Sequence, residues 1–319
     1  MAPPNPLGTA HRRPADAYRD VPILAQPTWN HEIAAYFYLG GVASGATLLG
    51  TLADLVGGSR LSALARTAHV VGLLALLPCP PLLIDDLGRP ERFHHMLRVF
   101  KPLSPMNVGS WTLTLDGGMA ALAALRALGS EASVPWLNGL ARRVPLRLVA
   151  LLGLPPALTL AGYPGVLLGT TSIPAWAESP LLGGLFAASA FVTGTAATSL
   201  AGSMTHPFDR PAQDALETIG LCSGLVELAL TGGFLATSGP AARPLVEGRG
   251  AALTALSVGL TAAGIVLGAA SRNAGHARRP LSALGSLSTL VAGAALRWGV
   301  VRAGHASAAD RATQLALQS

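Results

Sequence analysis

The sequence is poor in charge, in lysine and in cysteine. Of its 319 residues 12% are charged, compared with roughly 25% in an ordinary soluble domain. The mean hydropathy of +0.47 agrees with this low charge and excludes a typical water-soluble domain. Lys101 is the single lysine, so the formal net charge of +6 comes from arginines, which are scattered among the loops. Scattered basic charge is typical of membrane flanks and argues against nucleic-acid binding.

The scarcity of cysteine and of buried histidine limits the cofactors that this chain can hold. Its two cysteines, Cys79 and Cys222, both lie in apolar runs, so neither a disulfide framework nor a metal-cluster motif is available. Only His69 lies well inside an apolar run, whereas bis-histidine haem ligation across helices needs several buried histidines. We therefore expect no haem and no metal here, and any iron–sulfur clusters in a partner subunit.

What the chain does have is a succession of apolar runs of about 20 residues, each long enough to cross roughly 30 Å of hydrocarbon. They predict an all-α, polytopic membrane bundle of about eight transmembrane helices. The expected helices span residues 32–56, 62–84, 108–128, 147–169, 181–204, 214–237, 250–270 and 281–303.

An even number of crossings places both chain ends of the bundle on one side of the membrane. We expect a polar arm over residues 1–30, the bundle over 31–304 and a tail over 305–319. The loop 85–107 is long, highly charged and expected to be partly helical. Lysine and arginine are nearly equally divided between the two sides, so the positive-inside rule does not set the orientation.

The start of the first helix carries a group of polar side chains at the membrane boundary. Glu32 and Tyr36 are four residues apart and share a helix face, and His31 lies next to them. A carboxylate, a phenol and an imidazole at this depth can hydrogen-bond a quinol and accept its protons. The alternative is an interfacial anchor, because tryptophan and tyrosine are common at this depth.

Carboxylates deep in apolar runs are the second notable pattern, because each is costly to insert into a membrane. Asp116 and Glu227 lie inside expected helices, and Asp54 lies near the end of the first one. Each is a candidate for a proton route; a structural hydrogen bond is the alternative for Asp116, and a plain helix-end position for Asp54. Tyr163 follows two prolines in the fourth helix and is a candidate hydrogen-bond donor to a carbonyl, with simple packing as the alternative.

Several of these segments together resemble those of one family of membrane subunits. The segments are Trp29, Glu32, Tyr36 and Gly40–Gly45; Asp86–Phe93 and Met96–Pro105; Gly109–Trp111; and Tyr163–Leu168 with Thr170, Pro174 and Trp176. They cover most of the chain and resemble the NrfD/PsrC membrane subunits of polysulfide reductase, nitrite reductase and related molybdopterin oxidoreductase complexes.

The resemblance implies a haem-free, quinone-reactive subunit of an oxidoreductase complex, in the inner membrane of a bacterium. Menaquinone or ubiquinone would bind near one membrane face and exchange electrons with a ferredoxin-like iron–sulfur subunit. That partner would relay electrons to or from a molybdopterin-type catalytic subunit. Whether this chain by itself counts as an enzyme stays open.

The resemblance also implies roles for individual residues. The expected quinone-binding residues are His31, Glu32, Tyr36, Tyr163 and Asp85. Independently of the resemblance, the acidic residues Asp54, Asp86, Asp116 and Glu227 are the expected proton-transfer residues. The expected partner-docking residues on the long loop are Arg89, Glu91, Arg92, Arg98 and Lys101. Contact with lipid headgroups is the alternative for this loop.

Two other classes of protein share part of this pattern. A transporter or permease also has broken helices and buried carboxylates, but no repeat between the halves of the chain supports that interpretation. A membrane anchor without a redox site would tolerate phenylalanine in place of Tyr36 and Tyr163. Both remain alternatives on the sequence.

Overall fold

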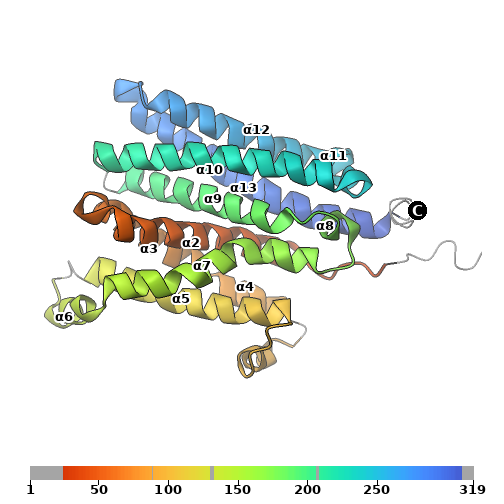
Figure 1. The fold of residues 1–319 in the computed structure, drawn as a ribbon, viewed down its shortest axis with the longest axis horizontal. Helices are drawn as coiled ribbons and strands as arrows, with labels where there is room; N and C mark the ends of the chain where they lie inside the picture. The colour runs from red at the N-terminus through yellow and green to blue at the C-terminus, as the bar shows by residue number, and fades with distance from the viewer. Residues whose placement is uncertain (1–23, 88, 130–132, 206–207, 311–319) are drawn as a thin grey trace, which may run out of the picture.

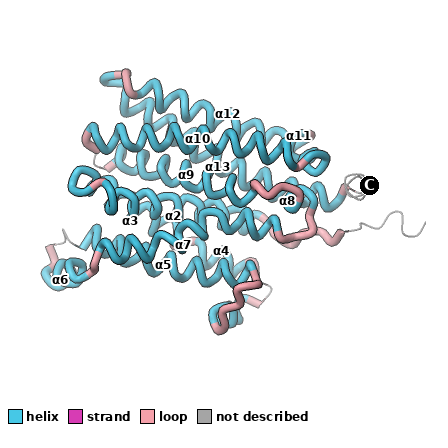
Figure 2. The backbone as a smooth tube through the Cα atoms, viewed as in Figure 1, coloured by secondary structure: helices cyan, strands magenta, loops and turns pink. Residues whose placement is uncertain are grey.

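The computed structural model describes residues 24–87, 89–129, 133–205 and 208–310, and within these ranges the regular structure is helical, without β-strands. Eight long helices lie side by side along one direction (Figure 1), joined by short connections (Figure 2). They are α2 (His31–Val56), α3 (Ser62–Leu76), α5 (Pro105–Gly129), α7 (Leu146–Gly169), α9 (Leu182–Met204), α10 (Arg210–Thr237), α12 (Gly248–Ser271) and α13 (Arg278–Ala309). The prediction of an all-α membrane bundle is confirmed.

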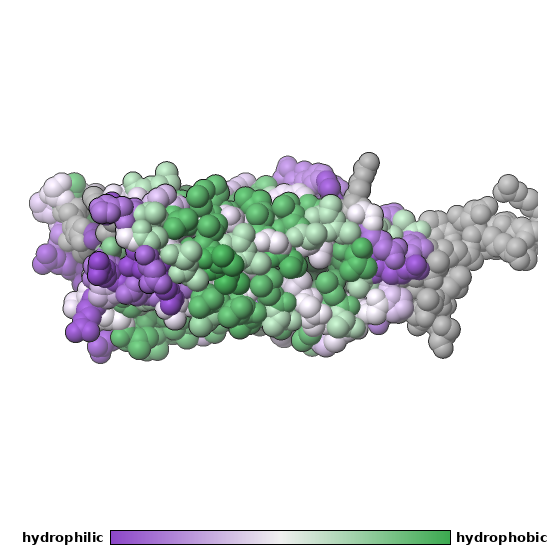
Figure 3. All heavy atoms as spheres, turned by 90° about the horizontal axis from the view of Figure 1, so that it is seen from above, coloured by the Kyte–Doolittle hydropathy of each residue, from purple (hydrophilic) through white to green (hydrophobic). Residues whose placement is uncertain are grey.

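Seven helical stretches of the described chain are long and apolar enough to cross a membrane. The remaining long helix is α5, which corresponds to the expected span 108–128 and packs against α3 and α7 inside the bundle. Asp116 and Arg126 lower its hydropathy. Apolar side chains cover the middle of the surface in view, with hydrophilic ones toward both ends (Figure 3).

The second helix is interrupted, although Gly58–Asp85 forms one stretch long and apolar enough to span a membrane, in agreement with the expected span 62–84. The chain makes a turn at Leu77 and Pro78 and resumes as the short helix α4 (Cys79–Asp85). Proline lacks the N–H that continues a helix, but fits the first turn of a new one, where Pro80 also lies. After α4, the long loop forms the 3₁₀-helix η2 (Pro90–Leu97), in agreement with its expected partial helicity.

The bundle consists of two groups of helices, which we call the N-terminal half (α2 to α7) and the C-terminal half (α9 to α13). They meet along α2 and α9 at two glycines. A Cβ atom at Gly45 would overlap the carbonyl oxygen of Ala190, and one at Gly194 would overlap the backbone of Gly45 and Ala46. The absence of side chains here lets the two backbones touch, as small residues do in other membrane helix pairs.

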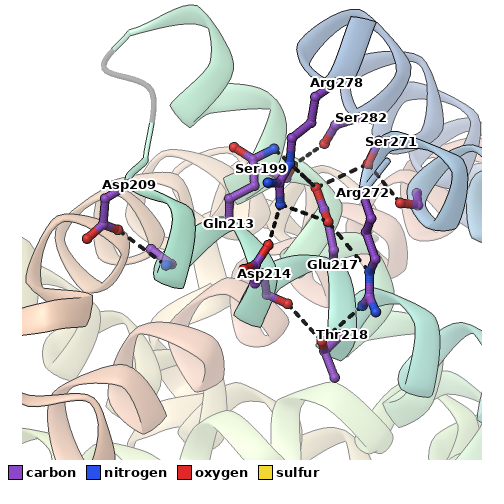
Figure 4. A network of polar contacts seen from close by, with 12 residues as sticks. Ser199, Asp209, Gln213, Asp214, Glu217, Thr218, Ser271, Arg272, Arg278 and Ser282 are labelled. Atoms are coloured by element: carbon purple, nitrogen blue, oxygen red, sulfur yellow. Dashed lines mark hydrogen bonds and ion pairs between the residues drawn. The ribbon is translucent and has the colours of Figure 1, made fainter. Parts of the chain in front are cut away.

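The two ends of the bundle differ in their polar contacts. At the end where α10 begins, Arg278 donates to both carboxylate oxygens of Glu217, at 3.1 and 3.0 Å, and also binds Asp214 (Figure 4). Ser271 donates to Glu217 at 3.1 Å, and Arg272 pairs with the same carboxylate. This network joins α10, α12 and α13. The other end holds the start of α2, the long loop and the short helix α8 (Pro174–Ala177).

Candidate functional site

A small cavity lies near the start of α2, where this helix meets α4, α5 and the end of α7. Its volume is about 30 Å³, enough for one or two water molecules. Residues that line it include Trp29, Tyr36, Asp86, Met96, Ser110 and Tyr163. Three of the expected functional residues, two quinone-binding tyrosines and one proton-transfer aspartate, therefore share one cavity. We call it the head cavity.

The two phenols of the head cavity are buried and come from different helices. Tyr36 on α2 is 2% exposed and Tyr163 on α7 is 7% exposed. The ring of Tyr163 lies directly over Gly109 of α5, where a Cβ atom would overlap the phenol. Glycine at position 109 is thus required for this placement of the ring. Two phenols therefore line the head cavity, together with the carboxyl group of Asp86 and the hydroxyl of Ser110.

One wall of the head cavity is anchored to the C-terminal half. Trp29 stacks on Trp176 of α8 with ring centroids 5.6 Å apart. The indole N–H of Trp176 donates to the carbonyl of Val300 in α13 at 2.7 Å, and His305 hydrogen-bonds the carbonyl of Trp29 at 2.7 Å. The chain before α2 is therefore held in place by contacts with both α8 and α13.

Asp86 is the acidic group of the head cavity and follows directly after α4. It is half-buried, and burial raises the pKa of its carboxyl group. The nearby carboxylates of Glu32 and Asp85 raise this pKa further. Asp86 therefore keeps its proton to a higher pH than an ordinary aspartate, which brings it closer to the range in which it can exchange protons at neutral pH.

The structure does not bring the other three expected quinone-binding residues into the lining of the head cavity. His31 is exposed and accepts a hydrogen bond at Nδ1 from the indole of Trp298, 3.2 Å away. Glu32 is half-buried and close enough to act on Asp86, and Asp85 is exposed at the end of α4. Their binding roles stay predictions.

A line of polar groups leads from the head cavity into the N-terminal half. The thiol of Cys79 is fully buried. It lies near Tyr36, because both side chains approach Gly40: a Cβ atom at Gly40 would lie 3.9 Å from each of them. Asp116 comes next, close enough to Cys79 to act on it electrostatically. Asp116 is fully buried, and neither of its carboxylate oxygens has a hydrogen-bond partner among the described residues. Such a group is costly unless it is uncharged.

Asp54 lies near the end of α2 and forms a contact with His69 there. Its Oδ2 lies 2.7 Å from Nε2 of His69, and the two side chains are 11% and 3% exposed. Nδ1 of His69 and the hydroxyl of Thr47, which line one small cavity beside this pair, have no partner among the described residues. Asp54 and His69 therefore form a buried acid–base pair at the end of α2 away from the head cavity.

Glu227 lies in the middle of the C-terminal half, in a different environment from Asp116. Its carboxyl group lies close to the hydroxyls of Ser189 of α9 and Thr261 of α12, and Arg297 of α13 acts on it electrostatically. One of its oxygens, Oε1, has no hydrogen-bond partner among the described residues. Arg297 donates to the hydroxyl of Ser189 and to the carbonyl of Phe186, and its guanidinium lies over the Phe186 ring. Both charged side chains are almost fully buried. Glu227 is thus balanced by a cation through Ser189.

Arg297 is a buried charged residue whose role was not predicted from the sequence. Its signal was present, because it is a lone arginine inside the apolar run 281–303, where insertion of a charge is costly. The sequence does not show which residues pair with Arg297, because Ser189 and Glu227 lie on other helices.

The five expected docking residues of the long loop, Arg89, Glu91, Arg92, Arg98 and Lys101, are all exposed. Phe93, Phe100 and Leu103 in the same loop are also exposed, Leu103 by 97%. Asn107 fixes the loop by accepting from the backbone N–H of Lys101 and donating to the carbonyl of Met96. The loop projects from the bundle (Figure 1), and its residue Met96 lines the head cavity.

In the described part of the chain, no group of three or more histidine, cysteine, aspartate or glutamate side chains is arranged to hold a metal ion. Comparison with known protein families gives one match: the family model described as "Polysulphide reductase, NrfD" matches residues 24–309. A search of the curated proteins found none that matches the chain.

Proposed function

The chain belongs to the polysulphide reductase NrfD family, and is thus a multi-pass membrane subunit of the molybdoenzyme-type oxidoreductases; we propose that it exchanges electrons with a quinone at the head cavity. The observation that carries this proposal is the meeting of Tyr36, Tyr163 and Asp86 around one cavity beside the long loop. We place the protein in the inner membrane of a bacterium, with menaquinone or ubiquinone as substrate.

The chemistry requires hydrogen-bond donors for the quinone oxygens and an acceptor for protons. Oxidation of one quinol releases two protons and two electrons. The phenols of Tyr36 and Tyr163 can donate to the two oxygens of the quinone ring, and Asp86 can take up a proton in its carboxylate form. The electrons would pass to iron–sulfur clusters in a partner subunit, and the reverse direction reduces the quinone with the same groups.

The head cavity must widen for a quinone ring to enter, because about 30 Å³ holds little more than water. Met96 and Met106 form part of its wall, and methionine side chains are flexible and adapt readily to irregular apolar shapes. Met106 is also 46% exposed, so it can move without displacing the core. Movement of these two thioethers is the least costly way to open the cavity.

The long loop is the proposed docking surface for a ferredoxin-like iron–sulfur subunit, which in turn would contact a molybdopterin-type catalytic subunit. Exposed arginines next to exposed phenylalanines are typical of protein interfaces, which are enriched in both residue types. Arg92, Phe93 and Phe100 show this combination. The loop adjoins the head cavity, so a docked partner would lie near the quinone. Contact with lipid headgroups is the alternative.

We also propose that protons reach or leave the head cavity through buried carboxylates. In the N-terminal half the route would run from Asp86 past Cys79 to Asp116, and toward Asp54 with His69. Glu227 would serve a second route in the C-terminal half. The support for these routes is the deep burial of carboxylates whose insertion into a membrane is otherwise unfavourable.

The experiment that tests the proposal uses the protein purified from its native membrane with whatever subunits remain bound. Electron paramagnetic resonance spectra are recorded before and after addition of a reduced menaquinone analogue. Iron–sulfur signals should appear on addition of quinol and should be absent with a quinone-site inhibitor. Tyr36→Phe and Tyr163→Phe should slow this reduction about tenfold or more.

Tyr38→Phe is the matched control, because Tyr38 lies on the same helix as Tyr36, does not line the head cavity and faces Arg297. It should leave the reduction rate unchanged. A chain that purifies alone, with no cluster signal and no bound quinone, would contradict the proposed function and return weight to the transporter interpretation.

A further inference from the structure

A second and much larger cavity lies on the outside of the N-terminal half, between α3, α4 and α5. Its volume is about 410 Å³. Residues that line it include Leu73, Leu77, Pro80, Leu113, Gly117 and Ala121. Leu77 is 61% exposed within a stretch apolar enough to span a membrane, so the open side of this groove faces hydrocarbon. We call it the side groove.

The side groove offers almost no free polar group to an occupant. Ser110 and Thr114 are its hydroxyl-bearing lining residues. Both hydroxyls donate to carbonyls of their own helix, Ser110 to Met106 at 3.1 Å and Thr114 to Ser110 at 2.9 Å. An occupant that fits this lining is a hydrocarbon chain, because a polar occupant would leave its own groups without partners.

Small residues on α5 create the space of the side groove. Gly117 and Ala121 are four residues apart and therefore lie on one face of the helix. A Cβ atom at Gly117 would already lie 3.4 Å from a methyl group of Leu76. Larger side chains at these two positions would fill the space between α5 and α3.

The side groove adjoins the head cavity. Leu83, Met96 and Ser110 line both spaces and therefore separate them, so displacement of the flexible Met96 side chain would join the two. The polar side chains lie around the head cavity, and the apolar volume lies in the groove. This distribution matches a ligand with a polar ring and a long hydrocarbon tail.

We propose that the side groove binds the isoprenoid tail of the quinone, and that the quinone enters from the bilayer between α4 and α5 past Met96. This inference rests on the proposed function, because the tail is bound to a ring in the head cavity. It adds a determinant of substrate specificity, namely tail length, at residues that do not contact the ring.

The test compares two quinols in the intact complex, one with a long isoprenoid tail and the tail-less menadiol. Gly117→Leu fills the side groove and leaves the residues around the ring unchanged. It should raise the KM for the tailed quinol about tenfold, the effect of losing the burial of fewer than two methylene groups. The KM for menadiol should change by less than about twofold.

Gly118→Leu is the matched control, because Gly118 is the neighbouring residue, is absent from the groove lining, and has no atom near the position of its Cβ. It should change neither KM. If Gly117→Leu prevents folding, Ala121→Phe serves instead, because Ala121 is at an exposed position of the groove where a larger side chain can be accommodated.

Equal effects of the groove variant on both quinols, or no effect on either, would overturn the tail site and leave a membrane lipid chain as the occupant. Failure of the unaltered complex both to oxidise either quinol and to reduce the corresponding quinones would instead overturn the proposed function itself. The two failures are distinguished by the activity of the unaltered complex with menadiol.

Discussion

The two halves of the bundle each bury a carboxylate in the membrane, but they surround it differently. In the C-terminal half, Glu227 lies close to two hydroxyl groups and Arg297 acts on it electrostatically, although its Oε1 has no hydrogen-bond partner among the described residues. In the N-terminal half, Asp116 is equally buried, and neither of its carboxylate oxygens has such a partner. The main difference between the two sites is the buried cation beside Glu227.

The halves also differ in how much space they leave. The N-terminal half contains the head cavity, the side groove and the chain break at Pro78. The C-terminal half is fastened internally by Arg297 and at one end by the network around Glu217. The C-terminal half also contains a cavity, of about 60 Å³ between α9, α10, α12 and α13, against about 410 Å³ for the side groove. The larger space therefore lies in the half to which we assign the proposed quinone site.

Among the variants that test this comparison, loss of the buried cation Arg297 should lower the stability of the protein most. Arg297→Met leaves Glu227 without its counter-charge and should lower the free energy of unfolding by about 3–5 kcal/mol. Thermal unfolding of the detergent-purified protein measures this. Arg302→Met, at an exposed position of the same helix, is the control and should have little effect. The double variant with Glu227→Gln should recover most of the loss; an unchanged loss would show that the pairing is not its cause.

The joint between the halves should be the next most sensitive position. Gly194→Val forces a side chain into the backbone of α2 and should destabilise the protein by about 1–3 kcal/mol. Gly184 lies on the same helix at a position where a Cβ atom would meet no other atom within 4 Å, so Gly184→Val should be tolerated. Similar thermal midpoints for the two variants would show that the halves can separate slightly without cost.

Asp116→Asn should distinguish stability from function in the N-terminal half. No charge partner is lost, so the thermal midpoint should change little, whereas loss of a proton carrier should lower quinol turnover about tenfold. Turnover and proton uptake by the complex in membrane vesicles measure the second effect. Unchanged turnover would remove Asp116 from the proposed route, and a stability loss as large as that of Arg297→Met would contradict the contrast between the halves.

The smallest expected effect is the pH dependence contributed by Asp86. Its raised pKa means that the folded protein holds this proton more tightly than the unfolded chain does. Stability should therefore fall as the pH rises from the ordinary aspartate pKa of about 3.9 to the raised value, and Asp86→Asn should flatten this slope. Thermal midpoints of both proteins across the acidic range measure it. If the midpoints of the two proteins changed in parallel with pH, the pKa of Asp86 would not be raised by folding.

The positions of the helices could be predicted from the sequence because membrane spans are defined by local hydropathy. The turn at Leu77 and Pro78 within the second span could not, because a proline is compatible with either a kink or a break in a helix. Tyr36 and Tyr163 were predicted as site residues, and the structure brings them to one cavity.

Pairings between helices could not be predicted in the same way. Asp54 with His69, and Glu227 with Arg297 through Ser189, join residues on separate helices whose rotation the sequence does not give. His31 illustrates the same point, because its hydrogen bond to Trp298 of α13 turns it away from the head cavity that its neighbours suggested. Hydropathy gives the depth of a residue, but not the direction in which its side chain points.

The contact between Gly45 and Gly194 has a consequence for biosynthesis. The ribosome delivers α2 long before α9, so the glycine surface of α2 must wait in the bilayer while the rest of the N-terminal half is inserted. Glu227 in turn enters before Arg297 has been translated. Assembly of the C-terminal half around α2 is therefore a late event, and a ribosome that stalls after α10 would leave an exposed acid for quality-control proteases to recognise.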